Sequence, residues 1–282
     1  AISNKVQTTS GRWLALDGRV LFKATVAASE RYNTRLETLL AERLGVRFTE
    51  RAQPDPRKRA VREVVGVPED LCTLWSSRRV AIEGARDQLV EEFVATHGRH
   101  PTPVEMIKLA QQANLDTRDA KHEPRSEADQ RTQWRREADQ TLGADVVDSI
   151  VAATRVAGRS RTAEEVSATD LAAAVVARLE ESRSTWQVWH VRAEAERQVR
   201  AIDVDPAQVD ALVEQVTAAA VGTGSVPLSA RAEVEVPAEL TRRDGLSVYE
   251  VAGSRLYTSP QILAAEERLI HAAPVELRAA AR

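Results

Sequence analysis

Apolar and polar residues alternate at the start of the chain with the two-residue period of a β-strand. A first run covers residues 2–7 and a second covers residues 12–16. The turn cluster TTSG at 8–11 separates the two runs. This order predicts an antiparallel hairpin. Because an edge strand is rarely left at a chain terminus, we expect sequence ahead of Ala1 to complete the sheet.

A helical stripe follows the hairpin. Apolar positions recur with the spacing of one helix face over residues 20–44, and Gly45 is suited to a left-handed C-cap. The stripe that we expect to be buried consists of Phe22, Val26, Ser29, Tyr32, Leu36, Leu39, Leu40 and Leu44. Two β-like pieces around a Pro-rich basic turn come next. Residues 1–67 therefore have the order strand–strand–helix–strand–strand, which indicates part of an α+β unit.

Longer helices are predicted after this unit. One helix covers residues 69–96 and ends at Gly98. Its expected buried side chains are Leu71, Leu74, Trp75, Ile82, Leu89 and Phe93. The string TPVE then makes Thr102 an N-cap, with Glu105 at the reciprocal position of a capping box.

The rest of the chain is also mainly helical. Ser126 begins a helix that ends near Gly143, and residues 144–166 have weak periodicity, which indicates a linker. The later predicted elements are a helix over 168–181 capped by Ser167, a helix that starts at Ser184 or Thr185, a helix over 206–221 closed by Gly222, a strand over 231–236, a hairpin over 247–258 and a helix over 260–273.

Composition narrows the class of protein. Aromatic residues make up only 4% of the chain, so its cores must be built from Leu, Val, Ile and Ala. The net charge of −3 neither favours nor excludes nucleic acid, because charge acts through its distribution. A single cysteine, Cys72, excludes a disulfide framework and fits a reducing compartment. No signal peptide or long apolar run is found, so we expect a cytoplasmic protein.

Few residues point to catalysis or metal binding. The spacing of His97 and His100 in HGRH is that of a possible pair of metal ligands. A zinc site needs three or four converging ligands, so capping of a helix end is the favoured interpretation. Tyr32 could be a nucleophile, yet it lies in the stripe predicted to be core. The chain contains no G-x-S-x-G, no G-x-x-x-x-G-K-[ST] and no G-x-G-x-x-G motif.

Basic residues are the stronger functional signal. The predicted DNA-binding set is Lys5 on the first strand, Arg57, Lys58, Arg59 and Arg62 around the Pro-rich turn, Arg78 and Arg79 in WSSRR, and Lys121 and Arg125 between two helices. Such groups neutralise phosphates, although an ordinary solvated surface would have the same composition. Trp13, Trp75 and Trp134 could stack on bases, but each also fits a buried stripe.

A helix-turn-helix regulator is a competing interpretation. The string GRHPTPVEMIKLAQQANLDTRDA resembles the helix-turn-helix sequence pattern of sigma factors and related regulators. That motif needs a recognition helix after a tight turn. The segment NLDTRDAKHEPRS is loop-like, so the recognition helix would be very short. This alternative is centred on residues 97–120.

Several strings, taken together, resemble the TrwC-type (MobF) conjugative relaxase–helicases. In chain order they are SNKVQTTSGRWLALDGR, ASERYNTRLETLLAERLGVRF, REVVGVP, WSSRRVAIEGARDQLVEEF, HGRHPTPVEMIKLAQQANLDTRDAKHEPRS and QRTQWRREAD. Weaker similarity continues through RSTWQVWHVRAEAERQVRA and SVYEVAGSRLYTSPQILAAEERLI.

The resemblance implies both an activity and an architecture. Relaxases of this family nick one DNA strand at a plasmid transfer origin through a tyrosine–phosphate ester, with a divalent metal polarising the phosphate, and unwind DNA with ATP and Mg²⁺. It implies that residues 1–67 belong to the palm sheet and 68–143 to helices that clasp the single strand. Residues 144–166 would be a linker, and 167–282 a helical segment with a hairpin that precedes a helicase domain.

The resemblance also places the metal-binding histidines and the nucleophilic tyrosine ahead of Ala1, and the helicase phosphate loop after Arg282. We therefore expect an internal fragment with no catalytic residue, metal or cofactor of its own, which contributes DNA binding. Its expected partners are single-stranded DNA at a transfer origin and the rest of the relaxase–helicase, and no membrane. The alternatives are the helix-turn-helix regulator and a degenerate remnant that binds nothing.

Overall fold

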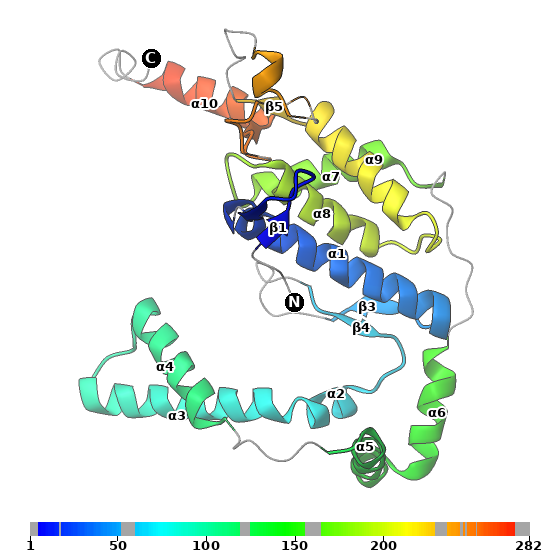
Figure 1. Cartoon of the computed structure of the whole chain (residues 1–282). Helices are drawn as coiled ribbons and strands as arrows, with labels where there is room; N and C mark the ends of the chain where they lie inside the picture. The colour runs from blue at the N-terminus through cyan, green and yellow to red at the C-terminus, as the bar shows by residue number, and fades with distance from the viewer. Residues whose placement is uncertain are drawn as a thin grey trace. The chain divides into compact units, whose positions relative to one another are not determined.

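The structure is a computed structural model that describes residues 5–16, 18–51, 60–118, 125–155, 165–228, 236–242, 245, 247–251 and 253–273. Within these residues the chain forms ten α-helices and three two-stranded antiparallel sheets (Figure 1). The predicted α+β, predominantly helical fold is confirmed. The chain divides into two compact units, one formed by Ala1–Leu44 with Gly158–Arg282 and the other by Gly45–Ala157. None of the described helices is long and apolar enough to cross a bilayer.

The first unit begins with the predicted hairpin. Strand β1 (Lys5–Gln7) pairs antiparallel with β2 (Trp13–Ala15), with Val6 opposite Leu14. The turn between them is closed by the Thr8 amide, which donates to the Arg12 carbonyl at 2.8 Å. Both strands are exposed along their whole length. The predicted hairpin is confirmed.

Helix α1 (Gly18–Leu44) follows, as the periodicity predicts, but its buried face is not the predicted one. The buried residues are Ala27, Glu30, Thr34 and Thr38, and the apolar stripe lies on the opposite side, with Phe22 84% exposed. The expectation that this stripe is core was therefore wrong, and Tyr32, taken as a packed aromatic, is 65% exposed. The polar face of α1 is buried because α1 packs on helix α8 (Val188–Arg200), which presents arginines and glutamates to it.

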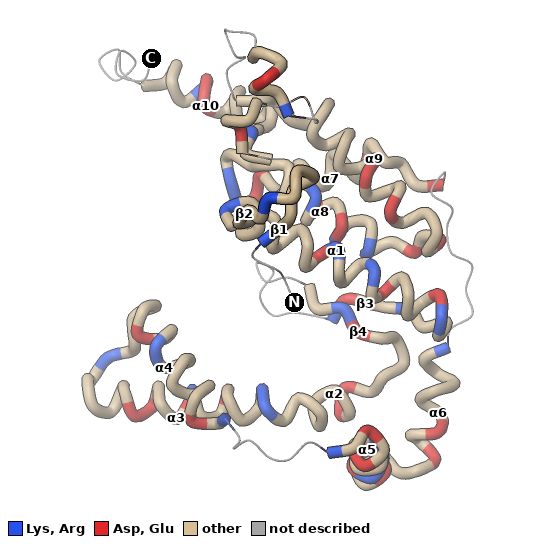
Figure 2. Tube along the Cα trace, in the orientation of Figure 1, with Lys and Arg blue, Asp and Glu red and all other residues tan. Residues whose placement is uncertain are grey.

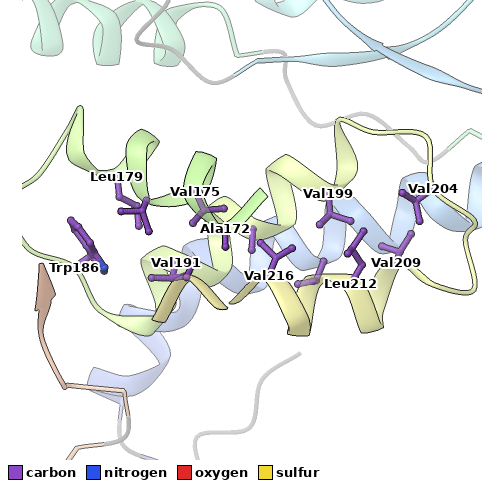
Figure 3. Close-up of a cluster of buried hydrophobic side chains, with 14 residues drawn as sticks. Ala172, Val175, Leu179, Trp186, Val191, Val199, Val204, Val209, Leu212 and Val216 are labelled. Atoms are coloured by element: carbon purple, nitrogen blue, oxygen red, sulfur yellow. The ribbon is translucent and has the colours of Figure 1, made fainter. Parts of the chain in front are cut away.

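The core of this unit lies among α7 (Ala168–Glu180), α8 and α9 (Val209–Gly222) (Figure 3). Its fully buried members include Val175, Trp186, Val191 and Leu212, each at 1% exposure or less. Ser167 caps α7 as predicted, its hydroxyl accepting from the Asp170 amide. The side chains are small, and Trp186 is the largest among the fully buried ones, in keeping with the low aromatic content.

The starts of α8 and α9 differ from the predictions. Helix α8 begins at Val188 and not at residue 184 or 185, because Trp186 is held in an extended bridge to Tyr257. The Trp186 amide donates to the Tyr257 carbonyl at 2.9 Å, and the Tyr257 amide donates back at 2.8 Å. Helix α9 begins at Val209 after a turn, and not at Pro206.

The C-terminal strands also pair differently from the prediction. Strand β6 (Tyr257–Thr258) pairs with β5 (Val226–Pro227), so the predicted hairpin over 247–258 is wrong. Residues 248–250 form a turn instead of a strand. Residues 231–235 of another predicted strand lie outside the described residues. A short 3₁₀ helix, η2, covers Ala238–Leu240. Helix α10 (Pro260–Ala272) starts as predicted, with the Ser259 hydroxyl accepting from the Ile262 amide.

The second unit begins with two strands and two helices. Strands β3 (Phe48–Glu50) and β4 (Arg62–Val64) pair antiparallel, as predicted. The single helix predicted over 69–96 is divided at Ser76 into α2 (Glu69–Trp75) and α3 (Ser77–His97). At the break the Ser76 amide donates to the Thr73 carbonyl at 3.1 Å, and the Ser76 hydroxyl donates to the Cys72 carbonyl at 2.6 Å.

The break changes the expected packing of this helix pair. Leu71 is buried as predicted, but Trp75 is 48% exposed and not core. Ile82, Leu89 and Phe93 of α3 are half-buried.

Three further helices complete this unit. Helix α4 (Pro103–Asp116) packs on α3 and carries the predicted capping box between Thr102 and Glu105. Helix α5 (Glu127–Leu142) starts at the Ser126 cap and contacts α2. Helix α6 (Ala144–Thr154) packs on α5, so the first part of the predicted linker is helical.

Candidate nucleic-acid interface

Four of the predicted DNA-binding residues lie outside the described residues. Arg57, Lys58 and Arg59 belong to the segment 52–59, and Lys121 belongs to the segment 119–124. Their contact with DNA stays a prediction. The other five predicted residues, Lys5, Arg62, Arg78, Arg79 and Arg125, are described.

Arg62 is committed to the β3–β4 ladder. Its side chain is only 12% exposed, donates to the Phe48 carbonyl at 3.3 Å and pairs with Glu50 at 3.9 Å. A phosphate would have to displace these partners, so Arg62 stabilises the ladder. Lys5 lies on the exposed strand β1, and Arg125 donates to the Gln133 side chain of α5. Within the second unit, the described contacts of Arg125 and of Arg62 are made with different partners.

Arg78 joins two helices. From the first turn of α3, its guanidinium donates to the Asn114 side-chain oxygen at 2.8 Å and to the Asn114 and Thr117 carbonyls at 3.4 Å. These carbonyls belong to the last turn of α4 and to its C-cap, where a cation is favoured by unpaired carbonyls and by the helix dipole. Arg78 therefore holds α3 against α4, in addition to any role in binding.

Replacing Arg78 by alanine is expected to loosen the end of α4. The loss should cost about 1 kcal/mol, because one solvated hydrogen bond contributes roughly 0.5–1.5 kcal/mol and the other two bonds, at 3.4 Å, are weak. Hydrogen exchange of the last α4 amides should therefore accelerate about fivefold. Arg79→Ala is the matched control, since Arg79 makes no described bond to α4. An unchanged α4 in Arg78→Ala would contradict the capping role.

A groove of about 580 Å³ lies where α2, α3 and α4 meet. Its lining consists of Trp75, Ser76, Ser77, Arg78, Arg79, Ile82, Glu83, Arg86 and Ala110. It thus joins a half-exposed indole to three guanidinium groups and one carboxylate. Two of the predicted residues, Arg78 and Arg79, are brought together here.

The charges of the groove are partly paired. The Arg79 Nε donates to Glu83 at 2.9 Å, one turn further along α3. Arg86 donates to Asp87 through two nitrogens, at 2.6 and 2.9 Å. Both pairs are exposed, and exposed pairs contribute only about 0.2–1 kcal/mol. A phosphate could therefore replace either carboxylate at small cost.

The start of α3 adds to the positive character of the groove. Ser76 and Ser77 line it, and α3 has no acidic residue in its first turn. The N-terminal end of a helix carries a partial positive charge and unpaired amides, both of which attract anions. An indole next to guanidinium groups is an arrangement that stacks a base while it neutralises the adjacent phosphate.

Arg86 and the two serines were not among the predicted residues. In the single helix predicted over 69–96, Trp75, Arg79, Ile82 and Arg86 follow the spacing i, i+4, i+7, i+11, which would place them on one face. That signal was present in the sequence. It was obscured because Trp75 and Ile82 were interpreted as buried, so the same face was expected to be covered.

The HGRH string forms a helix corner, in agreement with the favoured capping interpretation. His97 stacks on Phe93 with ring centroids 4.1 Å apart, and its Nδ1 is 3.0 Å from the Phe93 carbonyl. Arg99 lies 5.2 Å over the same ring and forms two hydrogen bonds with Glu105. Arg99 and the Thr102 amide hold the pKa of Glu105 well below its usual range. Among the described residues, no three His, Cys, Asp or Glu side chains converge to hold a metal.

Basic and acidic residues are interleaved along the helices of this unit. Figure 2 shows both blue and red positions on α3 and on α5. Arg131 pairs with Glu127, and Arg135 pairs with both Asp139 and Asp148. The groove is therefore distinguished less by the number of its arginines than by the hollow in which arginines and an exposed indole lie together.

An exposed aromatic among arginines, on a mainly helical chain with small antiparallel sheets, fits a protein that handles DNA strands. The TrwC relaxase family matches residues 1–141, which is half of the chain, and the protein belongs to this family. No curated protein and no solved structure matches the chain.

Proposed function

We propose that this chain is the DNA-holding part of a conjugative relaxase–helicase, and that single-stranded DNA from a plasmid transfer origin lies in the α2–α3–α4 groove. Membership of the TrwC relaxase family supports a role on DNA. The observation that carries the choice of site is the half-exposed Trp75 beside Arg79 and Arg86. Stacking on an indole requires unpaired, accessible bases, so this site favours a single strand over a duplex.

Nicking and unwinding belong, in this proposal, to other parts of the polypeptide. The family's nucleophilic tyrosine, histidine metal site and phosphate loop correspond to no motif in residues 1–282. The described residues provide no cluster that fits the divalent metal. In this proposal the contribution of the chain is to position and hold the strand.

The helix-turn-helix alternative gains no specific support. Helix α4 continues through Asp116, so part of the segment interpreted as a loop is helical. A recognition helix would have to occupy residues 117–125, most of which lie outside the described residues. This alternative becomes an outcome of the binding experiment below.

Replacing Trp75 by alanine is expected to weaken binding of a single-stranded oligonucleotide by about 5- to 150-fold. The estimate corresponds to the roughly 1–3 kcal/mol that one base–aromatic stack contributes. Trp75→Phe should retain most of the affinity, because a phenyl ring still stacks. Fluorescence anisotropy of a labelled oligonucleotide, measured against a duplex of the same sequence, gives both affinities.

Arg86→Ala tests the electrostatic half of the site. It should lower the slope of log affinity against log salt by about 0.7, the value for one phosphate contact on a single strand. Arg131→Ala, which removes the same charge from an exposed α5 pair, is the control and should leave the slope unchanged. A preference for duplex that survives Trp75→Ala would favour the regulator, and no binding at low salt would favour the remnant.

A further inference from the structure

The interface between α1 and α8 is polar. The α1 face buries Glu30 at 1% exposure and Thr34 at 2% exposure, with Ala27 beside them. The α8 face contributes Ala193 and Glu196, both nearly fully buried. Small residues at the contact let the helices approach closely, while the charged side chains around them must find partners.

Ion pairs provide those partners. Arg200 donates to Glu30 at 2.8 Å, and Arg197 donates to the other Glu30 oxygen at 3.1 Å. Arg200 also donates to the Glu30 carbonyl at 3.2 Å. The Arg200 Nε also lies 3.4 Å from the carboxylate of Glu37, another residue of α1. A single buried carboxylate of α1 is thus held by two arginines of α8.

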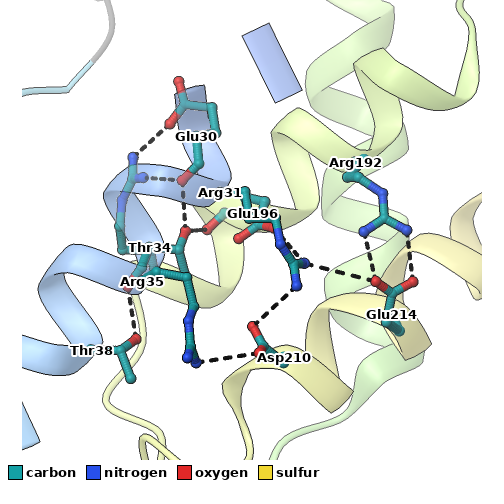
Figure 4. A network of polar contacts seen from close by, with 10 residues as sticks. Glu30, Arg31, Thr34, Arg35, Thr38, Arg192, Glu196, Asp210 and Glu214 are labelled. Carbon is teal, nitrogen blue, oxygen red and sulfur yellow. Dashed lines mark hydrogen bonds and ion pairs between the residues drawn. The ribbon is translucent and has the colours of Figure 1, made fainter. Parts of the chain in front are cut away.

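A second set of pairs reaches from α1 to α8 and α9 (Figure 4). Arg31 lies 3.7 Å from Glu196, 3.9 Å from Asp210 and 3.9 Å from Glu214. Arg35 pairs with Asp210 at 3.3 Å. Apart from Glu196, these side chains are 43–54% exposed, so salt in the solvent can screen them.

Apolar burial stabilises the bundle but contributes little to this interface. The hydrophobic core lies among α7, α8 and α9 and includes no residue of α1 (Figure 3). On α1, most large apolar side chains are exposed, with Phe22 84% and Leu36 41% exposed, while Leu39 and Leu40 are half-buried. The bundle α7–α9 therefore has a core of its own, whereas α1 is attached mainly by charge.

We infer that α7–α9 is an ion-pairing dock for α1, from which α1 can be released while the bundle stays folded. The helices α7–α9 lie beyond residue 141, where the family match ends. The helix that docks on them, α1, lies within the match. This assigns residues 168–222 a role in holding the relaxase segment by charge. Because the contact is ionic, the strength of docking depends on salt.

Hydrogen exchange of the full chain, followed by mass spectrometry, tests the inference. Exchange of the α1 amides should accelerate about fivefold or more between roughly 0.1 M and 1 M salt, as two or three exposed pairs are screened. The core amides of α7 and α9 should change less than about twofold over the same range. Equal acceleration of α1 and the bundle, or none in α1, would overturn the proposal.

Variants separate the dock from general stability. Asp210→Arg should release α1 at low salt, because it places a like charge beside Arg31 and Arg35. Adding Arg35→Asp to that variant should restore part of the protection by re-forming the pair in reverse. Arg178→Gln, which removes an exposed α7 charge paired with Glu181, is the matched control and should leave α1 unchanged. Failure of both the loss and the rescue would overturn the proposal, because the exposed, salt-sensitive pairs would then contribute nothing to docking.

Discussion

Glu30→Gln is expected to remove about 3–5 kcal/mol from the free energy that holds α1 on the bundle. The Glu30 side chain is 1% exposed and accepts hydrogen bonds from Arg197 and Arg200, the latter only 10% exposed. The variant would weaken two charge-assisted hydrogen bonds, each worth about 1.5–3 kcal/mol, while Arg197 keeps Glu194 and Arg200 keeps Glu37 as partners. Hydrogen exchange of the α1 amides measures the loss directly. A cost below about 1 kcal/mol would mean that Glu30 is dispensable for docking.

The same carboxylate makes docking sensitive to acid. Burial by itself would raise the pKa of Glu30, but the hydrogen bond from Arg200 and the charges of Arg197 and Arg200 outweigh it and lower the pKa below 4.5. A carboxyl whose pKa is lowered by folding contributes stability above its unfolded value. That stability is lost as the pH falls below about 4.5 and through the folded pKa. Glu30→Gln should remove this part of the acid dependence.

Glu196→Gln is the contrasting control. Burial raises the pKa of Glu196, and this outweighs the opposing effects of Thr34, Arg31 and Arg192. Its ionised form is therefore disfavoured by folding, and its contribution to stability decreases as the pH rises through the folded pKa. Replacing it by a neutral amide of the same shape should cost far less than Glu30→Gln. Equal losses in the two variants would show that shape, and not charge, governs the interface.

Trp186→Ala is expected to destabilise the α7–α9 bundle by about 3–5 kcal/mol, the usual cost of deleting a large buried aromatic side chain. Trp186 is 1% exposed and is the largest side chain among the fully buried ones. Its indole Nε1 donates to the Ser225 hydroxyl at 3.1 Å, and that hydroxyl donates to the Ala220 carbonyl at 2.7 Å. The variant would therefore leave both a cavity and a buried hydroxyl with one partner fewer.

Urea denaturation followed by circular dichroism measures this loss. Trp134→Ala is a suitable control, because Trp134 is 48% exposed on α5 and its removal should cost less than about 1 kcal/mol. A similar midpoint for the two variants would contradict the central place of Trp186 in the core. Trp186→Phe, which fills most of the space but lacks the indole donor, should fall between wild type and Trp186→Ala.

The groove could be only partly predicted from the sequence. Arg78 and Arg79 were found because adjacent arginines stand out in WSSRR, whereas Arg86 was missed because its role depends on which face of α3 is open. Trp75 was weighed as a base-stacking residue but assigned to the core. The break at Ser76 ends that helix early and leaves the indole 48% exposed. The interruption at Ser76, which periodicity does not predict, thus decided which side chains of this region are exposed.

The sequence by itself determined the local features and the family. The caps at Thr102, Ser126, Ser167 and Ser259 were predicted correctly, because each depends on a hydrogen bond spanning three residues. The hairpin at the start of the chain depends on an equally local turn. Similarity of several strings in one order identified the TrwC relaxase family, which the match over residues 1–141 confirms.

Only the tertiary structure decided which faces are buried and which strands pair. Periodicity identifies the apolar side of α1, but α8 selected the opposite side through Arg197 and Arg200, 167 and 170 residues from Glu30 in the chain. Tyr257 pairs with Trp186 rather than within a local hairpin. Such choices depend on the free energy of contacts between distant segments, and a buried ion pair or a strand bridge leaves no periodic signal in either partner alone.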